Sequence, residues 1–135
     1  MVLEIVKYGD PVLRQRGARI EGIAAEVAQL AADMLDTMRA ARGVGLAAQQ
    51  VGRACQLTVL DVRGIEDRPS TLEWEGKSVV VDEFMPLVLL NPEVKALGDP
   101  VAGPEGCLSF PELYAEISRP DQIEVKAQDL SLIHI

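Results

Sequence analysis

The feature that most constrains the fold is one helical repeat of apolar residues early in the chain. Between about Gly22 and Gly43, apolar side chains recur at steps of three or four residues, which places them on one face of an α-helix. The members of this face are Ile23, Val27, Leu30, Met34 and Met38. Asp33, Asp36 and Arg39 fall largely off it. Gly43 is expected to end the helix by taking a positive φ.

Short runs of β-branched and aliphatic residues follow this helix. The runs "CQLTVLDV" (55–62), "SVVVD" (78–82) and "PLVLLNPEV" (86–94) predict strands. "QIEVKAQD" (122–129) alternates, with Ile123, Val125 and Ala127 on one face, and predicts a half-buried antiparallel strand. Residues 64–77 and the region of Pro100 and Pro104 predict loop and turn. The sequence therefore predicts an α+β domain of short antiparallel strands packed around a helix.

The overall composition excludes several classes of protein. The 135 residues are enough for one domain, and 48% are apolar. A net charge of −8 argues against nucleic-acid binding. No apolar run is long enough to predict a membrane-spanning helix, and the charged start is unlike a signal peptide. We expect a cytoplasmic protein in which Cys55 and Cys107 are free thiols or metal ligands.

Two stretches have residue types suited to chemistry. In "GVGLAAQQVG" (43–52), the glycines permit close approach to the backbone, and a glutamine amide can donate to a developing oxyanion. Taken alone, this pattern favours a plain helix cap with solvated glutamines. In "EGCLS" (105–109), Cys107 follows a glycine, as an exposed nucleophile or metal ligand would. Taken alone, a cysteine is more often a small buried apolar residue.

The partners of Cys107 are the difficulty. A catalytic metal takes about three protein ligands, and a thiolate nucleophile needs a base. The chain holds one histidine, His134, two residues from its end. One cysteine and one terminal histidine do not complete a metal site, and a base near a chain end lacks a fixed position.

Together the two stretches are specific. "GVGLAAQQ" and "EGCLS", in this order and at this separation, resemble the first two signature motifs of peptide deformylase, and "AAQQ" stands where that family usually has "AAPQ" or "AATQ". "IVKYGDPVLR" (5–14) is similar to the family's start and "LLNPEV" (89–94) to its central strand, so the resemblance covers nearly all of residues 1–129.

The resemblance implies an activity and a set of roles. Peptide deformylases remove the formyl group from the N-terminal formyl-methionine of nascent polypeptides, using a divalent metal held by one cysteine and two histidines. By resemblance the metal is Fe²⁺, with Zn²⁺, Ni²⁺ or Co²⁺ as substitutes, and the partners are formyl-methionyl peptides and ribosome-associated nascent chains. Cys107 matches the metal ligand. Gln50 and the backbone N–H of Leu108 match the oxyanion donors. Val44, Gly45 and Gly106 match positions along the bound peptide.

The third motif of that family, a helical HExxH, has no counterpart in this sequence. "LSLIHI" (130–135) looks like translated sequencing adapter. We therefore expect residues 1–129 to be an incomplete deformylase domain that lacks its C-terminal active-site helix. HExxH is expected within about 40 residues after Asp129 in the parent gene, room for a strand and a helix. The chain as written is expected to be inactive. Two alternatives remain: a hydrolase with Cys107 as nucleophile and His134 as base, and a non-catalytic peptide-binding homologue using the edge at residues 43–45.

Overall fold

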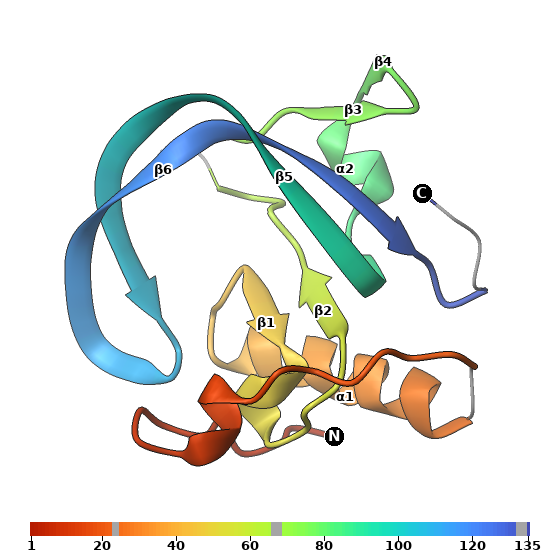
Figure 1. Ribbon diagram of the computed structural model, residues 1–135, viewed down its shortest axis with the longest axis vertical. Coiled ribbons are helices and arrows are strands. Elements are labelled where there is room, and N and C mark those ends of the chain that lie inside the picture. The colour runs from red at the N-terminus through yellow and green to blue at the C-terminus, as the bar shows by residue number, and fades with distance from the viewer. Residues whose placement is uncertain (23–24, 66–68, 132–134) are drawn as a thin grey trace.

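The computed structural model describes residues 1–22, 25–65, 69–131 and 135. One helix and a small sheet form the base of the molecule, and a long two-stranded ribbon arches out of the sheet and returns toward it (Figure 1). The predicted α+β class is confirmed, with two differences: two of the strands are long, and a second small sheet is present. No helix within the described ranges is long and apolar enough to cross a membrane.

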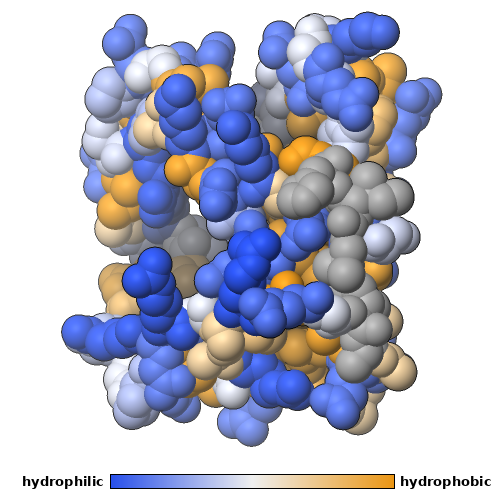
Figure 2. All heavy atoms as spheres, turned by 45° about the vertical axis from the view of Figure 1, so that its right-hand side comes forward, coloured by the Kyte–Doolittle hydropathy of each residue, from blue (hydrophilic) through white to orange (hydrophobic). Residues whose placement is uncertain are grey.

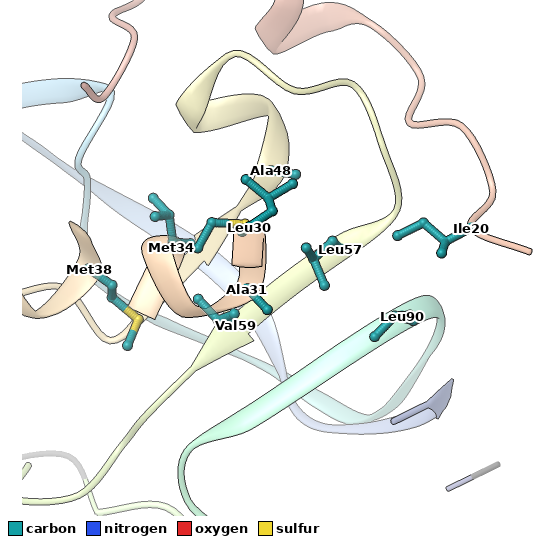
Figure 3. Close-up of a cluster of buried hydrophobic side chains, with 10 residues drawn as sticks. Ile20, Leu30, Ala31, Met34, Met38, Ala48, Leu57, Val59 and Leu90 are labelled. Carbon is teal, nitrogen blue, oxygen red and sulfur yellow. The ribbon is translucent and has the colours of Figure 1, made fainter. Parts of the chain in front are cut away.

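Helix α1, Ala25–Ala40, contributes the largest buried side chains. Leu30, Met34 and Met38 are buried as the apolar repeat predicts, and they pack against Leu57 and Val59 of β2 (Figure 3). The helix begins at Ala25, later than predicted, and Ile23 lies outside the described residues.

Asp33 corrects the expected polar face of this helix, because it is buried. Its carboxylate accepts a hydrogen bond from the Met1 ammonium at 3.0 Å and another from the Gln29 amide at 2.9 Å. The Met1 ammonium lowers the pKa of Asp33, with a smaller contribution from Gln29, so the buried group remains a carboxylate. A charged residue therefore lies at the edge of the apolar face because its charge is paired.

The main sheet contains four antiparallel strands in the order β1-β2-β5-β6. Their bounds are β1 Gly45–Ala47, β2 Leu57–Leu60, β5 Leu87–Cys107 and β6 Phe110–Gln128. Strand β2 is central, and its buried Leu57 and Val59 alternate with half-buried residues. Strand β1 lies at one edge of the sheet, and this position matters for the site.

Strands β5 and β6 have 21 and 19 residues, so the expectation of short strands is wrong for this pair. Pro100 and Pro104 were expected in a turn and lie inside β5. Beyond Leu90 the pair is a two-stranded ribbon, where a proline is tolerated if its nitrogen faces away from the partner strand. Pro100 lies directly opposite Pro120 at a shift in the register.

The ribbon buries little of its surface. Ala127, close to the sheet, is buried and Val125 is half-buried, whereas Ile123 is 55% exposed, contrary to the predicted buried face. The ribbon leaves the core at this point, so alternation no longer produces burial. On the face of the molecule drawn in Figure 2, apolar side chains are interspersed with hydrophilic ones at the surface. The large exposed apolar residues of the ribbon are Val94, Leu97, Val101, Leu113, Tyr114 and Ile123.

A small hairpin stands where the sequence predicts loop. Its strands are β3, Leu72–Trp74, and β4, Lys77–Val79. The two residues between them, Glu75 and Gly76, have φ of 53° and 79°, as a tight hairpin turn requires. The strand predicted at 78–82 is confirmed for its first two residues, which belong to β4, whereas its last two lie in a one-turn helix, α2 (Val81–Phe84).

The N-terminal segment lies across the sheet and the helical turn that follows β1. It contains a 3₁₀ turn, η1, at Pro11–Arg14, and a second such turn, η2, spans Ala48–Val51. Ala18 bridges Cys55, and the Asn91 side chain bonds both the N–H and the C=O of Ile20, at 2.8 and 2.7 Å. These contacts attach residues 17–20 to the sheet.

We expect Gly17→Ala to lower the free energy of unfolding by about 1–3 kcal/mol, as overpacking typically does. A Cβ at Gly17 would lie 2.9 Å from the carbonyl carbon of Cys55, and backbone cannot yield as a side-chain end can. Urea titration measures the effect. Gly22→Ala is the control, because no described residue other than its chain neighbours lies within 4 Å of its added carbon. Equal midpoints for the two variants would contradict the close approach.

Candidate active site

The amide of Gln50 is held in one orientation. Gln50 lies in η2, immediately after the edge strand β1. The Ala47 N–H donates to Gln50 Oε1 at 3.0 Å, and the Val6 N–H donates to the Gln50 backbone carbonyl at 2.9 Å. Because the amide oxygen accepts this bond, the amide nitrogen must point the other way. Gln50 therefore presents N–H donors to the space in front of it.

That space is bordered by Cys107 and Ser109. The Gln50 Nε2 atom lies 3.6 Å from Cys107 Sγ and 3.4 Å from Ser109 Oγ. Cys107 is exposed, so the interpretation of it as a buried apolar residue is wrong. Neither cysteine is in a disulfide, in agreement with the expectation that both are free thiols or metal ligands. The structure thus brings together residues 57 positions apart in the sequence.

The turn that carries Cys107 is held by the start of the chain. Cys107 pairs with Phe110, which leaves Leu108 and Ser109 as the tip of the β5–β6 hairpin. The Tyr8 N–H donates to the Ser109 carbonyl at 2.9 Å, and the Tyr8 ring lies 4.7 Å from that of Phe110. Figure 1 shows the ribbon returning to the N-terminal segment at this tip.

Gly43 makes room for this tip. A Cβ at Gly43 would lie 2.7 Å from Leu108 Cδ1, which confirms the expected close approach. The expected positive φ at Gly43 is wrong, because Arg42 takes it with φ 58°. The Gly43 N–H donates to the Met38 carbonyl at 2.9 Å and the Arg42 N–H to that of Arg39 at 3.1 Å. These two bonds close the C-terminal end of α1 around a left-handed residue. That residue is Arg42, one position before the predicted Gly43.

Val44 and Gly45 lie along an open sheet edge. The Asp61 N–H donates to the Val44 carbonyl at 2.8 Å, so that carbonyl faces β2. Successive residues of a strand point their backbone groups to opposite sides, so the N–H and C=O of Gly45 face away from β2. Both residues are exposed. A peptide can therefore pair with the chain at Gly45.

Gly106, beside Cys107, has a structural reason to lack a side chain. It lies opposite Tyr114, and a Cβ there would come within 2.8 Å of the tyrosine ring. The ring packs across the glycine from the neighbouring strand, as aromatic residues do in antiparallel pairs. Gly106 itself is exposed next to the thiol.

The two adjacent glutamines have different surroundings. Gln49 Nε2 lies 3.4 Å from the Gln15 carbonyl in the N-terminal loop. Gln50 instead faces Cys107. Both are half-buried, so neither is the solvated side chain that the plain helix cap implies.

The described residues do not complete a metal site. Within ranges 1–22, 25–65 and 69–131 and at Ile135, no three His, Cys, Asp or Glu side chains form a group that could hold a metal. Cys107 supplies one donor, and its polar neighbour is an amide. His134 lies outside the described residues, so the structure does not test the alternative in which it serves as the base for a Cys107 nucleophile.

Three supporting residues were not assigned roles from sequence. The buried Ser109 hydroxyl faces Gln50, and Lys7 Nζ reaches the Leu108 carbonyl at 3.5 Å. Tyr8 bonds the same turn. Ser109 lies within the "EGCLS" motif, and Lys7 and Tyr8 lie within "IVKYGDPVLR". The resemblance to the family identified these two segments, but it did not indicate which of their residues support the site.

The family model described as Polypeptide deformylase matches residues 2–135. The chain belongs to the peptide deformylase family. A curated peptide deformylase from Opitutus terrae is 45% identical over 131 residues, which cover 96% of this chain and 68% of that protein. The crystal structure of peptide deformylase from Thermotoga maritima is 31% identical, with a TM-score of 0.81, and is matched over 100% of this chain and 79% of its own.

Another solved peptide deformylase, from Synechococcus elongatus in complex with actinonin, is 36% identical with a TM-score of 0.80. The match covers 98% of this chain and 63% of that one. Peptide deformylase is a metal-dependent hydrolase family, so the exposed thiol beside an oriented amide lies in a protein of a metal-using class.

In the reduced, metal-free protein at pH 7, we expect iodoacetamide to modify Cys107 several times faster than Cys55. The thiolate is the reactive form, and burial raises the pKa of the half-buried Cys55 thiol, whereas Cys107 is exposed. Peptide mass mapping over time measures both rates. Raising the pH to about 9 should narrow the gap, because it increases the thiolate fraction of Cys55. Equal rates at pH 7 would contradict the different exposures.

Proposed function

We propose that this protein, in its complete form, hydrolyses the N-formyl group from the N-terminal formyl-methionine of nascent polypeptides. The observation that carries the proposal is the Gln50 amide nitrogen, oriented by Ala47 and lying 3.6 Å from the Cys107 thiol. Membership of the peptide deformylase family supports the same reaction. Gln50 and Cys107 match the residues that the resemblance assigns to this chemistry.

In this proposal, Gln50 and the backbone N–H of Leu108 stabilise the oxyanion that forms as the formyl carbonyl is attacked. Two oriented donors lower the energy of a tetrahedral intermediate more than that of the planar substrate. Gln50 is suited to the task because its orientation is already fixed before substrate binds. Leu108 is suited because the N-terminal segment holds its turn.

Val44, Gly45 and Gly106 would form the channel for the substrate peptide. The free N–H and C=O of Gly45 allow the peptide to add as a strand at the edge of β1. The formyl end must lie near Gln50, which follows β1, so the bound peptide runs antiparallel to β1. The lack of a side chain at Gly45 and Gly106 leaves room for its backbone.

We propose that Cys107 is a metal ligand, that Fe²⁺ is the native metal and that Zn²⁺, Ni²⁺ or Co²⁺ can replace it. A thiolate combined with imidazoles suits these first-row metals. The two imidazoles would come from an HExxH segment beyond Asp129, with residues 1–129 forming the incomplete domain and 130–135 a non-native tail. When bound, such a metal supplies an activated water.

The cellular setting follows from the substrate. Formyl-methionine is present at the start of new chains, so the proposed partners are nascent polypeptides at the ribosome and the proposed compartment is the cytoplasm.

In the metal-loaded protein expressed from its intact gene, we expect Gln50→Ala to lower kcat for a formyl-Met peptide by about 10²-fold or more, as loss of an oxyanion donor does. Formate release measures the rate. Gln49→Ala is the matched control, because Gln49 faces the Gln15 carbonyl and not the thiol. Similar losses in the two variants would show that the roles are wrongly assigned.

The 135-residue chain, loaded with Fe²⁺, Co²⁺ or Ni²⁺ without oxygen, is expected to release no formate. One thiolate among the described residues does not fix a metal with a defined geometry. The product of the intact gene is assayed beside it with the same peptide. Comparable metal-dependent turnover by the short chain would show that the ligands lie elsewhere.

A further inference from the structure

A charged recess lies at the end of α1, next to the proposed peptide channel. Its volume is about 370 Å³, and its lining includes Arg39, Arg42, Arg63, Asp61 and Val44. We call these residues the arginine recess. Val44 belongs both to this recess and to the proposed peptide edge, so the two are continuous.

Among the described residues that line it, the arginine recess has more positive than negative side chains. Arg63 binds Asp61 through two contacts, Nε to Oδ1 at 3.0 Å and Nη2 to Oδ2 at 2.6 Å. Arg39 reaches the same carboxylate only at 4.0 Å. The hydrogen bond from Arg63 lowers the pKa of Asp61, which keeps the carboxylate charged. The described lining thus has three guanidinium groups and one carboxylate, on a chain whose net charge is −8; Asp82 also attracts Arg63 from outside this lining.

Arg42 is the guanidinium that this carboxylate does not satisfy. Within the described part of the chain, no ion pair or hydrogen bond involves its side chain, which is exposed. Its backbone is fixed at φ 58° by the bonds that close α1. The negative end of the helix dipole favours a cation here, but it does not explain Arg63, which follows β2.

The direction of the bound peptide leads to this recess. With its formyl end at Gln50 and its backbone antiparallel to β1, the peptide passes Gly45, then Val44, and then reaches Arg42. Each residue of an extended chain advances about 3.3 Å, so the side chains of the second to fourth residues come beside the recess.

We propose that the arginine recess binds an acidic side chain of the substrate, within the three residues that follow formyl-methionine, and that Arg42 is its main contact. This inference rests on the proposed deformylase function. A substrate carboxylate would pair with the positive charge of Arg42, which Asp61 does not neutralise. A guanidinium can bind such a carboxylate through two parallel hydrogen bonds.

The test uses the metal-loaded protein from its intact gene and formyl-Met-Ala-Ala-Ala peptides with Glu or Gln at position 2, 3 or 4. At low salt, kcat/KM for Glu should exceed that for Gln about threefold to tenfold at one position, as a partly exposed ion pair allows. The difference should lie mainly in KM and should shrink in about 0.5 M NaCl, which screens exposed charges.

Arg42→Gln should abolish this preference, and Arg42→Lys should retain part of it. Arg16→Gln is the control for net charge, because Arg16 is exposed in the N-terminal loop and is not part of the recess. It should leave both the rate and the preference unchanged. Arg39→Gln provides a second recess variant if Arg42→Gln does not fold.

The outcomes separate the two proposals. Hydrolysis of every peptide without a Glu preference would overturn the recess and leave the deformylase function standing. Equal loss of preference in Arg16→Gln and Arg42→Gln would overturn it too, because long-range charge would then suffice. Release of no formate from any peptide would overturn the deformylase function itself.

Discussion

The hydrogen bond from the Ala47 N–H to Gln50 Oε1 fixes the site on which the proposed chemistry depends. An amide can present either an acceptor or a donor, and only the donor stabilises an oxyanion. Ala47 is the last residue of the edge strand, and its N–H points away from β2, so this N–H can donate to Gln50 Oε1. The same alternation along β1 that orients Gln50 also opens Gly45 to a peptide, so donor and peptide channel come from one short strand.

The site is otherwise assembled from distant parts of the chain. The turn at Leu108 and Ser109 is bonded by Lys7 and Tyr8, while Gly43 gives the Leu108 side chain its space. Cys107 therefore lies opposite Gln50 because two separate segments, at residues 7–8 and at Gly43, hold the hairpin tip. A thiol at the end of an unsupported ribbon would have no fixed position.

Local periodicity predicted α1 well, because Leu30, Met34 and Met38 meet β2 as an apolar helical face should. It predicted the ribbon poorly. A proline interrupts a strand only where its nitrogen would have to donate a hydrogen bond to the neighbouring strand. The sequence does not show whether the nitrogens of Pro100 and Pro104 point toward that neighbour, so a turn was predicted where β5 continues. The close approach at Gly43 was predictable from its lack of a side chain. The positive φ at Arg42 was not, because it depends on how the last turn of α1 closes.

The candidate site divides in the same way. The residues at its centre, Gln50 and Cys107, could be located by resemblance. The orientation of Gln50 and the burial of Ser109 could not, since both depend on where the hairpin tip comes to rest. The recess at Arg42 could not be predicted either. Asp61 and Arg63 are distant from Arg39 in sequence and lie beside it because β2 pairs with β1.

Pro100 and Pro120 face each other across the ribbon, and neither has an N–H to donate. This rung therefore has no N–H donor on either strand, and it separates the part of the ribbon next to the sheet from the part that ends at Cys107. Backbone amides near this rung should exchange with solvent sooner than those at Leu89 and Leu90. The outer half is nevertheless attached at its far end, where Lys7 and Tyr8 bond the turn beside Cys107, so the ribbon is anchored at both ends and interrupted in the middle.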